Sequence, residues 1–466
     1  EDAAYTGTFL SLMLGVGILV TVLVTVAVRH LPVPGLHPRA AIVLVAVSPL
    51  LVGPVMTSRF DLWPALLAGL AIAIAATGRL RIAAIVLGLA IATKAWPAVI
   101  LPILVAAAWR RAGRRAAVVV LLLAVATAAL VLAPFLVLAP GGVIATLTEQ
   151  LSRPLQVESL GASLLFVTHF LIGLPLSVVS SFGSQNIDGE LASALAIGSS
   201  LAMGVGLAIV WVRFARSAGD AARLLTAAAA AVAVYIAFGK VLSPQYVIWL
   251  LPIVPLVPGR RGLVAIGLYA IVLLATVGYF PSGYQALVEQ RDVHVAWSLL
   301  VRNVALAALA IELIVPWERV GAWVDALRTD PAARARLAAR VPSPGTLFVL
   351  LFVASLLIRA LWLAKPDGSL IFDETYYVNA ARVINGFAVP EQAPYATATP
   401  FLDPNMEHPP LGKALIALSM SIFGDQAIGW RLPSIATGML SIVALWSIVN
   451  VLTRRPWIAL LAATLL

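Results

Sequence analysis

Apolar runs of about twenty residues recur along this chain of 466 residues, and they constrain its fold more than any other feature. A helix of that length spans the hydrocarbon core of a bilayer. The mean hydropathy of +1.00, with 61% hydrophobic and 11% charged residues, excludes an ordinary soluble protein. The sequence therefore predicts an all-α, polytopic transmembrane helical bundle.

The net charge of +10 comes from basic residues that gather in short clusters between the apolar runs. Loops on the cytoplasmic side of a membrane collect Lys and Arg in this way. We therefore interpret the charge as a sign of topology and expect no nucleic-acid partner. The chain has no cysteine, so it has neither disulfides nor thiolate metal sites.

The alternation of apolar runs and basic clusters predicts where the chain crosses the membrane. Residues 82–109 are too long for one crossing and contain Lys94, so we expect a bent hairpin of two short helices there. Pro244 should break a helix, and residues 160–180 are predicted to form either an interfacial segment or a hairpin. The other predicted apolar segments are 9–28, 40–56, 62–76, 116–138, 191–212, 247–257, 263–279, 295–315, 347–363 and 427–451.

The clearest boundary lies at residues 316–345, where five arginines and three acidic residues accompany apolar residues at near-helical spacing. This pattern predicts a basic amphipathic linker on the anionic cytoplasmic leaflet, although an ordinary basic loop explains it equally well. The linker separates two predicted units, residues 1–315 and 346–466. Because the chain begins at Glu1 and its last apolar run is short, we expect a fragment of a longer polypeptide.

A polar stretch at residues 371–413 follows a predicted crossing and is expected on the outer face of the membrane. It contains the adjacent carboxylates Asp373 and Glu374. A carboxylate near a low-dielectric boundary binds protons more tightly, which makes Asp373 a candidate general base for a hydroxyl. The alternative is a solvated cap of a helix that begins at Thr375.

The same stretch contains His408, two prolines and Lys413, followed by a short apolar segment, 409–423, that we expect to lie along the outer surface. A helix start attracts anions, so Lys413 and Arg431 are predicted to bind a lipid phosphate. Alternatively, both cations only reach up to lipid headgroups. Glu407 and His408 could hold a divalent metal together with Asp373, but no ligand spacing supports such a site, and no cofactor is assigned.

An enzyme that acts on the outer face cannot use cytosolic nucleotide-activated sugars, so its donor should arrive within the membrane. Carboxylates and cations at this depth suit a donor whose leaving group is a lipid-linked phosphate. The base would then act on the attacking hydroxyl, and the phosphate-binding groups would act on the leaving phosphate.

The motifs FDETYY, MEHPPLGK and WRLPS, in this order, resemble the amino-terminal part of the protein O-mannosyltransferases and related phospholipid-carrier-dependent glycosyltransferases of the GT-C fold. The resemblance covers residues 346–466. It implies that Asp373 is the catalytic base with Glu374 beside it, and that Arg431 binds the carrier phosphate. His408 and Lys413 belong to the family's HPPLGK motif.

The first unit has its own polar candidates on the predicted outer side. Glu158 beside Gln156 suits sugar hydroxyls, and Lys240 suits a phosphate. Each candidate has a structural alternative: Asp61 pairs with Arg59, and Pro244 only kinks a helix. The full set of candidate substrate-binding residues is Arg59, Asp61, Gln156, Glu158, Lys240, Gln245 and Tyr246.

Four segments of this unit together resemble the GT87 family of polyprenol-phosphate-mannose-dependent transferases, which also has the GT-C fold. They are SRFDLWPALL, ATKAWPAVILP, RPLQVESLGAS and FGKVLSPQYVIWLLP. The resemblance spans residues 5–315. It implies a catalytic Asp in a first outer loop upstream of Glu1, so no base is assigned in this unit.

Together the two resemblances imply a tandem GT-C glycosyltransferase of the plasma membrane, the bacterial inner membrane, with active-site loops on the extracytoplasmic face. Each unit would move a sugar, expected to be mannose, from a polyprenyl-phosphate carrier to an acceptor hydroxyl. The carrier lies in the bilayer, so membrane lipids are expected partners. The second unit is expected to use a Ser or Thr protein acceptor, and the first a glycan or glycolipid. The alternatives are a polytopic lipid or solute transporter or flippase, and an inactive fusion or fragment.

Overall fold

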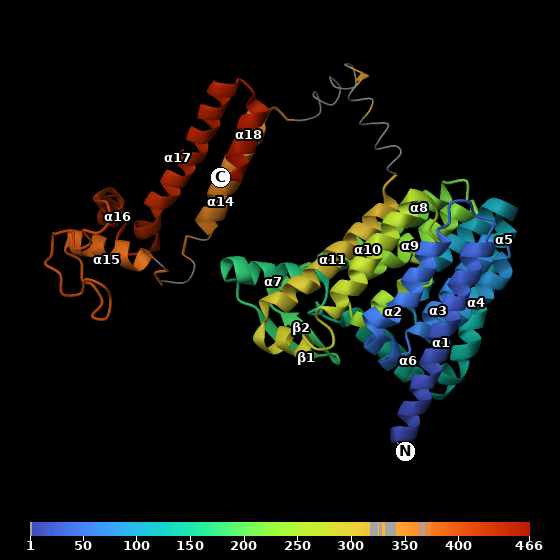
Figure 1. Cartoon of the computed structure of the whole chain (residues 1–466). Coiled ribbons are helices and arrows are strands. Elements are labelled where there is room, and N and C mark those ends of the chain that lie inside the picture. Colours follow the sequence, from blue (N-terminus) through green and yellow to red (C-terminus); the bar gives the residue numbers. More distant parts are fainter. Residues whose placement is uncertain are drawn as a thin grey trace. The chain divides into compact units, whose positions relative to one another are not determined.

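The computed structural model describes residues 2–316, 342–361, 363–364, 369–371 and 373–466, together with residues 325, 329 and 330. Most of the predicted linker, 316–345, lies outside these residues. The chain separates into two compact units, Glu1–Pro316 and Trp317–Leu466 (Figure 1). Eight of the described helices are long and apolar enough to cross a membrane. The predicted all-α, polytopic class is confirmed.

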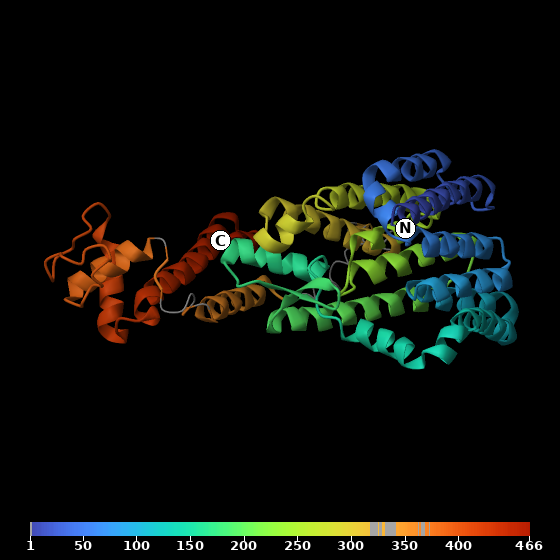
Figure 2. The ribbon, with the colours of Figure 1, turned by 90° about the horizontal axis from the view of Figure 1, so that it is seen from below.

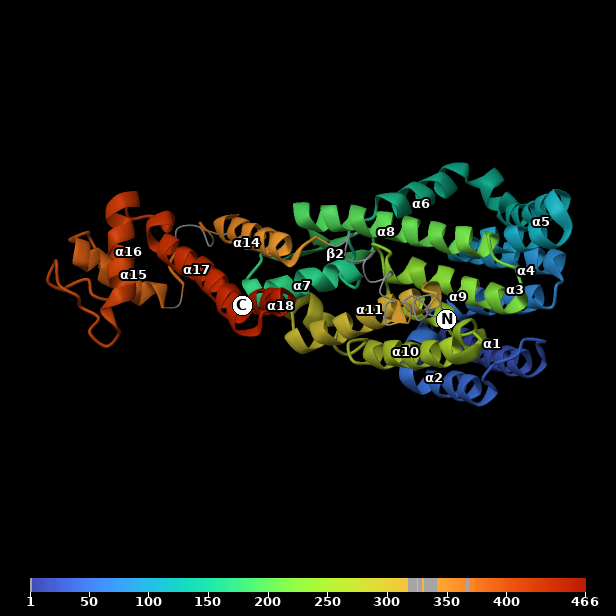
Figure 3. The same cartoon turned by 90° about the horizontal axis from the view of Figure 1, so that it is seen from above.

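The helices of the amino-terminal unit run alongside one another (Figure 2, Figure 3). Several of its basic loops are joined at one end, where Arg110 donates to the carbonyl of Ser217 and Arg261 to that of Val315. This agrees with the expectation that basic loops share one side. The α-helices of this unit are α1 (Asp2–His30), α2 (Pro38–Ser58), α3 (Leu62–Ala76), α4 (Leu80–Thr93), α5 (Leu101–Leu138), α6 (Pro140–Ser152), α7 (Leu160–Ile172), α8 (Glu190–Ala215), α9 (Ala221–Ala237), α10 (Gly259–Val277) and α11 (Val293–Ile314).

The helical hairpin predicted around Lys94 is confirmed. Helix α4 ends at Thr93, and Lys94 is extended, with φ −162° and ψ 138°. A 3₁₀ turn, η1 (Trp96–Ile100), leads into α5, which is interrupted again at Ala112 and Gly113. Helices α4 and α5 pack against each other, and Lys94 lies at the break between them.

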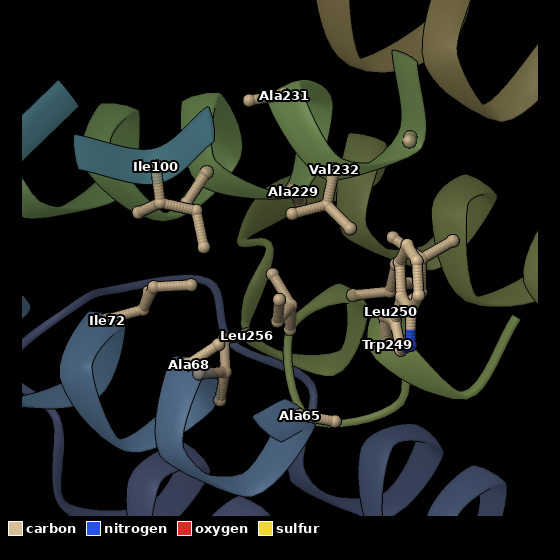
Figure 4. Close-up of a cluster of buried hydrophobic side chains, with 14 of the residues drawn as sticks. Ala65, Ala68, Ile72, Ile100, Ala229, Ala231, Val232, Trp249, Leu250 and Leu256 are labelled. Carbon is tan, nitrogen blue, oxygen red and sulfur yellow. The ribbon is translucent and has the colours of Figure 1, made fainter. Parts of the chain in front are cut away.

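Residues 247–257, predicted as an ordinary crossing, form 3₁₀ turns instead, η2 (Pro244–Leu250) and η3 (Val254–Leu256). Prolines at 244, 252, 255 and 258 remove backbone donors too often for an α-helix. Irregular backbone at this depth is tolerated because protein surrounds it, and the side chains are buried. Figure 4 shows Trp249, Leu250 and Leu256 between small residues of α3 and α9.

The ambiguous stretch 160–180 begins as α7 and continues into an antiparallel hairpin that the sequence did not indicate. Its strands are β1 (Ser177–Ser181) and β2 (Ser184–Asp188), paired with Val178 opposite Ile187. The loop at 155–157 joins this hairpin, since Ile187 N donates to Leu155 O (2.9 Å) and Val157 N donates to Gln185 O (3.0 Å). The hairpin therefore holds the loop that carries Gln156 and Glu158.

The carboxyl-terminal unit has five described helices. Three of them, α15, α16 and α17, enclose a small core that includes Val378, Ala381, Met420 and Trp430. The short segment predicted to lie along the surface forms α16, which has 14 residues. Its interfacial placement stays a prediction. The helices are α14 (Pro344–Leu361), α15 (Glu374–Asn385), α16 (Pro410–Phe423), α17 (Ala427–Thr453) and α18 (Pro456–Leu465).

Candidate functional site

Asp373 immediately precedes α15, and its carboxylate is exposed. The helix begins at Glu374, and the Asp373 side chain makes no capping hydrogen bond. Its backbone carbonyl instead accepts from the amide of Tyr377 (3.0 Å). The helix-cap alternative therefore does not describe this carboxylate, which is exposed to solvent.

Glu374 and Arg431 form a two-pronged ion pair between α15 and α17. Arg431 Nε donates to Glu374 Oε1 and Nη2 donates to Oε2, each at 2.8 Å. Arg431 also donates to the carbonyls of Leu363 (2.8 Å) and Ser369 (3.0 Å), and Ile371 N donates to Glu374 Oε2 (3.1 Å). Two parallel hydrogen bonds of this kind fix the orientation of the guanidinium as well as the position of its charge. Glu374, which follows Asp373 in the chain, therefore holds Arg431 in place at the start of α17.

Lys413 is fully buried at the start of α16. Its ammonium pairs with Asp403 Oδ2 (2.6 Å) and donates to the carbonyls of His408 (2.9 Å) and Asn405. These partners use the three donors of an ammonium group. Lys413 thus fastens loop 403–408 to α16, while its predicted phosphate contact stays a prediction.

His408, the last residue of this loop, lies against Tyr377 of α15. Its Nδ1 is 3.0 Å from Asn405 Oδ1, and its ring meets the Tyr377 ring edge-on at 5.5 Å. Asp373 and Tyr377 are four residues apart, so they share one side of the helix start. His408 also lines a pocket of about 610 Å³ with Thr399, Asp403 and Met406. The structure therefore brings Asp373, Tyr377 and His408 to one side of this unit.

A second polar cluster, which we call the polar end, lies in the amino-terminal unit at residues 59–61, 94–96, 153–159, 238–246 and 278–284. Asp61 is buried there and pairs with Lys94 rather than Arg59 (Lys94 Nζ to Asp61 Oδ1, 2.6 Å). The same oxygen accepts from Trp249 Nε1 (2.6 Å). The Lys94 ammonium also lies 5.5 Å from the Tyr246 ring centre, while Arg59 is exposed.

Glu158 is the centre of a buried hydrogen-bond network at the polar end. Tyr279 donates to Glu158 Oε1 (2.8 Å), and Arg302 donates to both the Tyr279 hydroxyl and the Glu158 carbonyl. Asn303 Nδ2 donates to the same carbonyl (3.1 Å). Burial raises the pKa of Glu158 to about 7, while the nearby Arg302 and the Tyr279 hydrogen bond oppose that increase.

Gln156 connects the loop of Glu158 to the loop of Lys240. Its backbone amide donates to Lys240 O (3.0 Å), and its side-chain Nε2 donates to Ser243 Oγ (3.1 Å) and Glu158 Oε2 (3.3 Å). Gln156 Oε1 is buried and has no hydrogen-bond partner among the residues that the structure describes. Gln245 is partly buried on η2, next to Tyr246.

The Glu158 network predicts a pH-dependent stability. The pKa rises from its ordinary value of 4.5 to about 7 on folding, so folding favours the neutral acid. The stabilisation relative to the ionised form is complete below pH 4.5 and is lost as pH rises through 7. We expect the melting temperature of the full chain, followed by tryptophan fluorescence in detergent, to fall by roughly 5 °C between pH 5 and pH 8.

Glu158→Gln serves as the matched control, because it keeps the shape of the side chain and does not titrate. This variant should lose most of that pH dependence. A slope equal to that of the wild type would show that Glu158 does not titrate in this range.

Sequence reasoning missed several residues of both clusters. In the amino-terminal unit these are Tyr279, Arg302 and Asn303; Arg302 could have been found because a charged residue inside an apolar helix is a signal of function. In the carboxyl-terminal unit they are Arg382 and Asp425, which form an ion pair (2.9 Å). Among the described residues, no three His, Asp or Glu side chains converge as metal ligands.

The end of the chain matches a known family. Residues 407–466 match the family of dolichyl-phosphate-mannose-protein mannosyltransferases. The polyprenol-phosphate-mannose–protein mannosyltransferase of Mycobacterium tuberculosis is 32% identical over 100 residues, which are 21% of this chain and 18% of that protein. The enzyme of the same name from Mycolicibacterium smegmatis is 29% identical over 111 residues, 23% of this chain and 20% of the relative.

The alignments thus span about a fifth of the length of these relatives. No solved structure matches the chain. The family match includes His408, Lys413 and Arg431, and begins after Asp373 and Glu374. The carboxyl-terminal segment is therefore similar to membrane mannosyltransferases, while the resemblance of residues 5–315 to GT87 stays a prediction.

Proposed function

We propose that the carboxyl-terminal unit belongs to a mannosyltransferase that moves mannose from a polyprenyl-phosphate carrier to a Ser or Thr hydroxyl of a protein. The observation that carries this proposal is the exposed, uncapped carboxylate of Asp373 beside the Glu374–Arg431 pair. The similarity of residues 407–466 to mannosyltransferases supports it. The names of the mycobacterial relatives support the donor and the protein acceptor.

In the proposed reaction, Asp373 accepts the proton of the acceptor hydroxyl while the hydroxyl oxygen bonds to C1 of mannose. The bond between C1 and the phosphate oxygen breaks, and its electron pair leaves with the polyprenyl phosphate. Arg431 supplies positive charge for that phosphate, since a guanidinium suits phosphate oxygens. Glu374 holds Arg431, His408 contacts substrate, and Lys413, paired with Asp403, keeps loop 403–408 in place.

We place this reaction at the extracytoplasmic face of the plasma membrane. Within the carboxyl-terminal unit, Arg454 and Arg455 follow the end of α17 that is away from Arg431, and basic residues of this kind face the cytoplasm in most membrane proteins. A donor that is carried by a membrane lipid suits a site on the other face, where nucleotide-activated sugars are absent.

For the amino-terminal unit we propose a second transfer site, at the polar end, with a glycan or glycolipid acceptor. The cations there include Lys94, Arg153 and Lys240, and the carboxylate of Asp61 is already paired. Burial, and then the charge of Arg153, lower the pKa of Lys240, so a bound phosphate would relieve the repulsion between these cations. Lys240 is the proposed phosphate ligand, and Gln156 Oε1, buried without a partner, is the proposed acceptor for a sugar hydroxyl.

The remaining candidates are assigned to the rim or the wall of this second site. Arg59 is exposed, and Gln245 and Tyr246 begin the buried η2 segment. Glu158 and Asp61 shape the wall through their hydrogen bonds to Tyr279 and Trp249. These residues are proposed to contact donor or acceptor sugar.

The acceptors distinguish the two proposed sites. The membranes contain the full chain and labelled polyprenyl-phosphate mannose. They are supplied with a Ser/Thr peptide, with its Ala-substituted analogue, or with a short mannosylated glycolipid. We expect label in the Ser/Thr peptide and none in the Ala analogue. Absence of label from the Ser/Thr peptide contradicts the carboxyl-terminal assignment, and absence from the glycolipid contradicts the amino-terminal one.

A further inference from the structure

Asp425 lies in the short connection between α16 and α17 and accepts hydrogen bonds from two directions. Trp430 Nε1 donates to Asp425 Oδ1 (2.6 Å) from the first turn of α17. Arg382 Nε, from α15, donates to Oδ1 (3.1 Å) and Oδ2 (2.9 Å). One carboxylate thus joins the connection, the start of α17 and the second half of α15.

The partners of Asp425 are themselves fixed. Arg382 is buried, its guanidinium lies 5.3 Å from the Trp430 ring centre, and its Nη1 donates to Asn379 Oδ1 (2.7 Å). Trp430 belongs to the core of this unit. A partly buried, charge-assisted pair of this kind is stronger than an exposed one. The cluster of Arg382, Asp425 and Trp430, which we call the clamp, therefore holds side chains of three segments in one arrangement.

The connection itself is tight. A Cβ atom at Gly429 would come 2.2 Å from the carbonyl oxygen of Gly424, so only glycine fits where the chain turns back on itself. This close approach keeps the connection short and holds Asp425 next to Trp430.

The clamp and the Glu374–Arg431 pair act on the same two helices. Trp430 and Arg431 are neighbours in the first turns of α17, and they are tied to α15 through Arg382 and Glu374 respectively. Glu374 and Arg382 are eight residues apart, about 12 Å along the helix. Two ties at that separation fix the direction of α15 relative to α17, whereas one tie would allow α15 to pivot.

We propose that Asp425 is a positioning residue, which through Arg382 and Trp430 fixes where the start of α15 presents Asp373 relative to Arg431. This inference rests on the proposed transfer of mannose. Asp425 does not contact the reacting atoms in this account. Loss of its carboxylate frees α15 to pivot about the Glu374–Arg431 pair, which turns the start of the helix and so changes the direction in which Asp373 is presented to Arg431. Misplacement of about 1 Å is enough to slow a positioned reaction strongly.

The test compares three variants of the full chain. Asp425→Ala removes both ties of the clamp, and Asp425→Asn keeps an oxygen that accepts from Trp430. Asn385→Ala is the matched control, because it removes a hydrogen bond from α15 to α16 (Asn385 Nδ2 to Ala417 O, 2.7 Å) and leaves the clamp intact.

Kinetics are measured per amount of folded protein. We expect Asp425→Ala to lower kcat/KM for polyprenyl-phosphate mannose at least tenfold, mainly through kcat, because the base is turned while Arg431 stays held by Glu374. Asp425→Asn should recover part of that loss, and Asn385→Ala should stay within about twofold of the wild type. A purely structural role would reduce the amount of folded protein and leave kcat/KM unchanged, and that result overturns the proposal.

A second readout does not depend on activity. The chain has no cysteine, so spin labels can be placed at Ala388→Cys, just beyond the end of α15 that is away from Glu374, and at Leu440→Cys on α17, which are both exposed. Asp425→Ala should broaden the distance distribution between the labels, and Asn385→Ala should not. An unbroadened distribution in Asp425→Ala overturns the clamp. If the distribution broadens while the wild type transfers no mannose, the proposed function fails and the alignment role of Asp425 stands.

Discussion

Replacement of Asp373 by Asn is expected to lower mannosyl transfer by a factor of about 10² to 10⁴, the usual contribution of a general base. Asn keeps the size of the side chain but cannot accept the proton of the acceptor hydroxyl at neutral pH. The Asp373 side chain makes no capping hydrogen bond, so its replacement should not disturb α15. Transfer is measured as label moved from polyprenyl-phosphate mannose to a Ser/Thr peptide in membranes with matched protein levels.

Glu391→Gln is the control for this variant, because Glu391 is also an exposed carboxylate in the same unit and has no assigned role. It should retain wild-type transfer. If Asp373→Asn also transfers mannose at the wild-type rate, another group takes the proton and the assignment of the base is wrong.

Replacement of Arg431 by Lys is expected to lower kcat/KM by about 10²-fold, even though the positive charge is kept. A guanidinium binds both oxygens of Glu374 at 2.8 Å and also reaches the carbonyls of Leu363 and Ser369. A lysine ammonium is a point charge on a flexible stem and cannot make the two parallel bonds. Glu374 would then hold the cation loosely, and the donor phosphate would meet a misplaced charge.

Arg454→Lys is the corresponding control, because Arg454 ends α17 at the helix terminus away from Arg431 and is exposed. The measurement is kcat/KM for the lipid-linked donor with the peptide held at saturation. Equal values of kcat/KM for Arg431→Lys and the wild type would show that Arg431 does not bind the donor phosphate.

The regular helices could be predicted from the sequence because each depends on a long local pattern. The predicted segment 62–76 coincides with α3, Leu62–Ala76, and the break at Lys94 was also expected. The segment 247–257 was misjudged because hydropathy does not register how often proline interrupts the backbone. The hairpin of β1 and β2 is short and polar, and it has no strong alternation to indicate it.

The candidate sites were only partly predictable because their contacts join distant residues. Asp373, Glu374 and Arg431 were identified from motifs, but the Glu374–Arg431 pair depends on how α15 meets α17. Tyr279 lies 121 positions from Glu158 along the chain, so its hydrogen bond could not be inferred. For Lys413, the sequence predicted a positive charge near a phosphate, and the structure adds a buried anchor of its loop.

The most direct test of the account is the choice of donor by the full chain in proteoliposomes. The Ser/Thr peptide is offered with labelled polyprenyl-phosphate mannose in the bilayer or with a labelled nucleotide-activated mannose in solution. We predict transfer of label from the lipid-linked donor, none from the soluble one, and loss of the lipid-dependent signal in Asp373→Asn. Transfer from the nucleotide sugar alone, or from neither donor, would contradict the account.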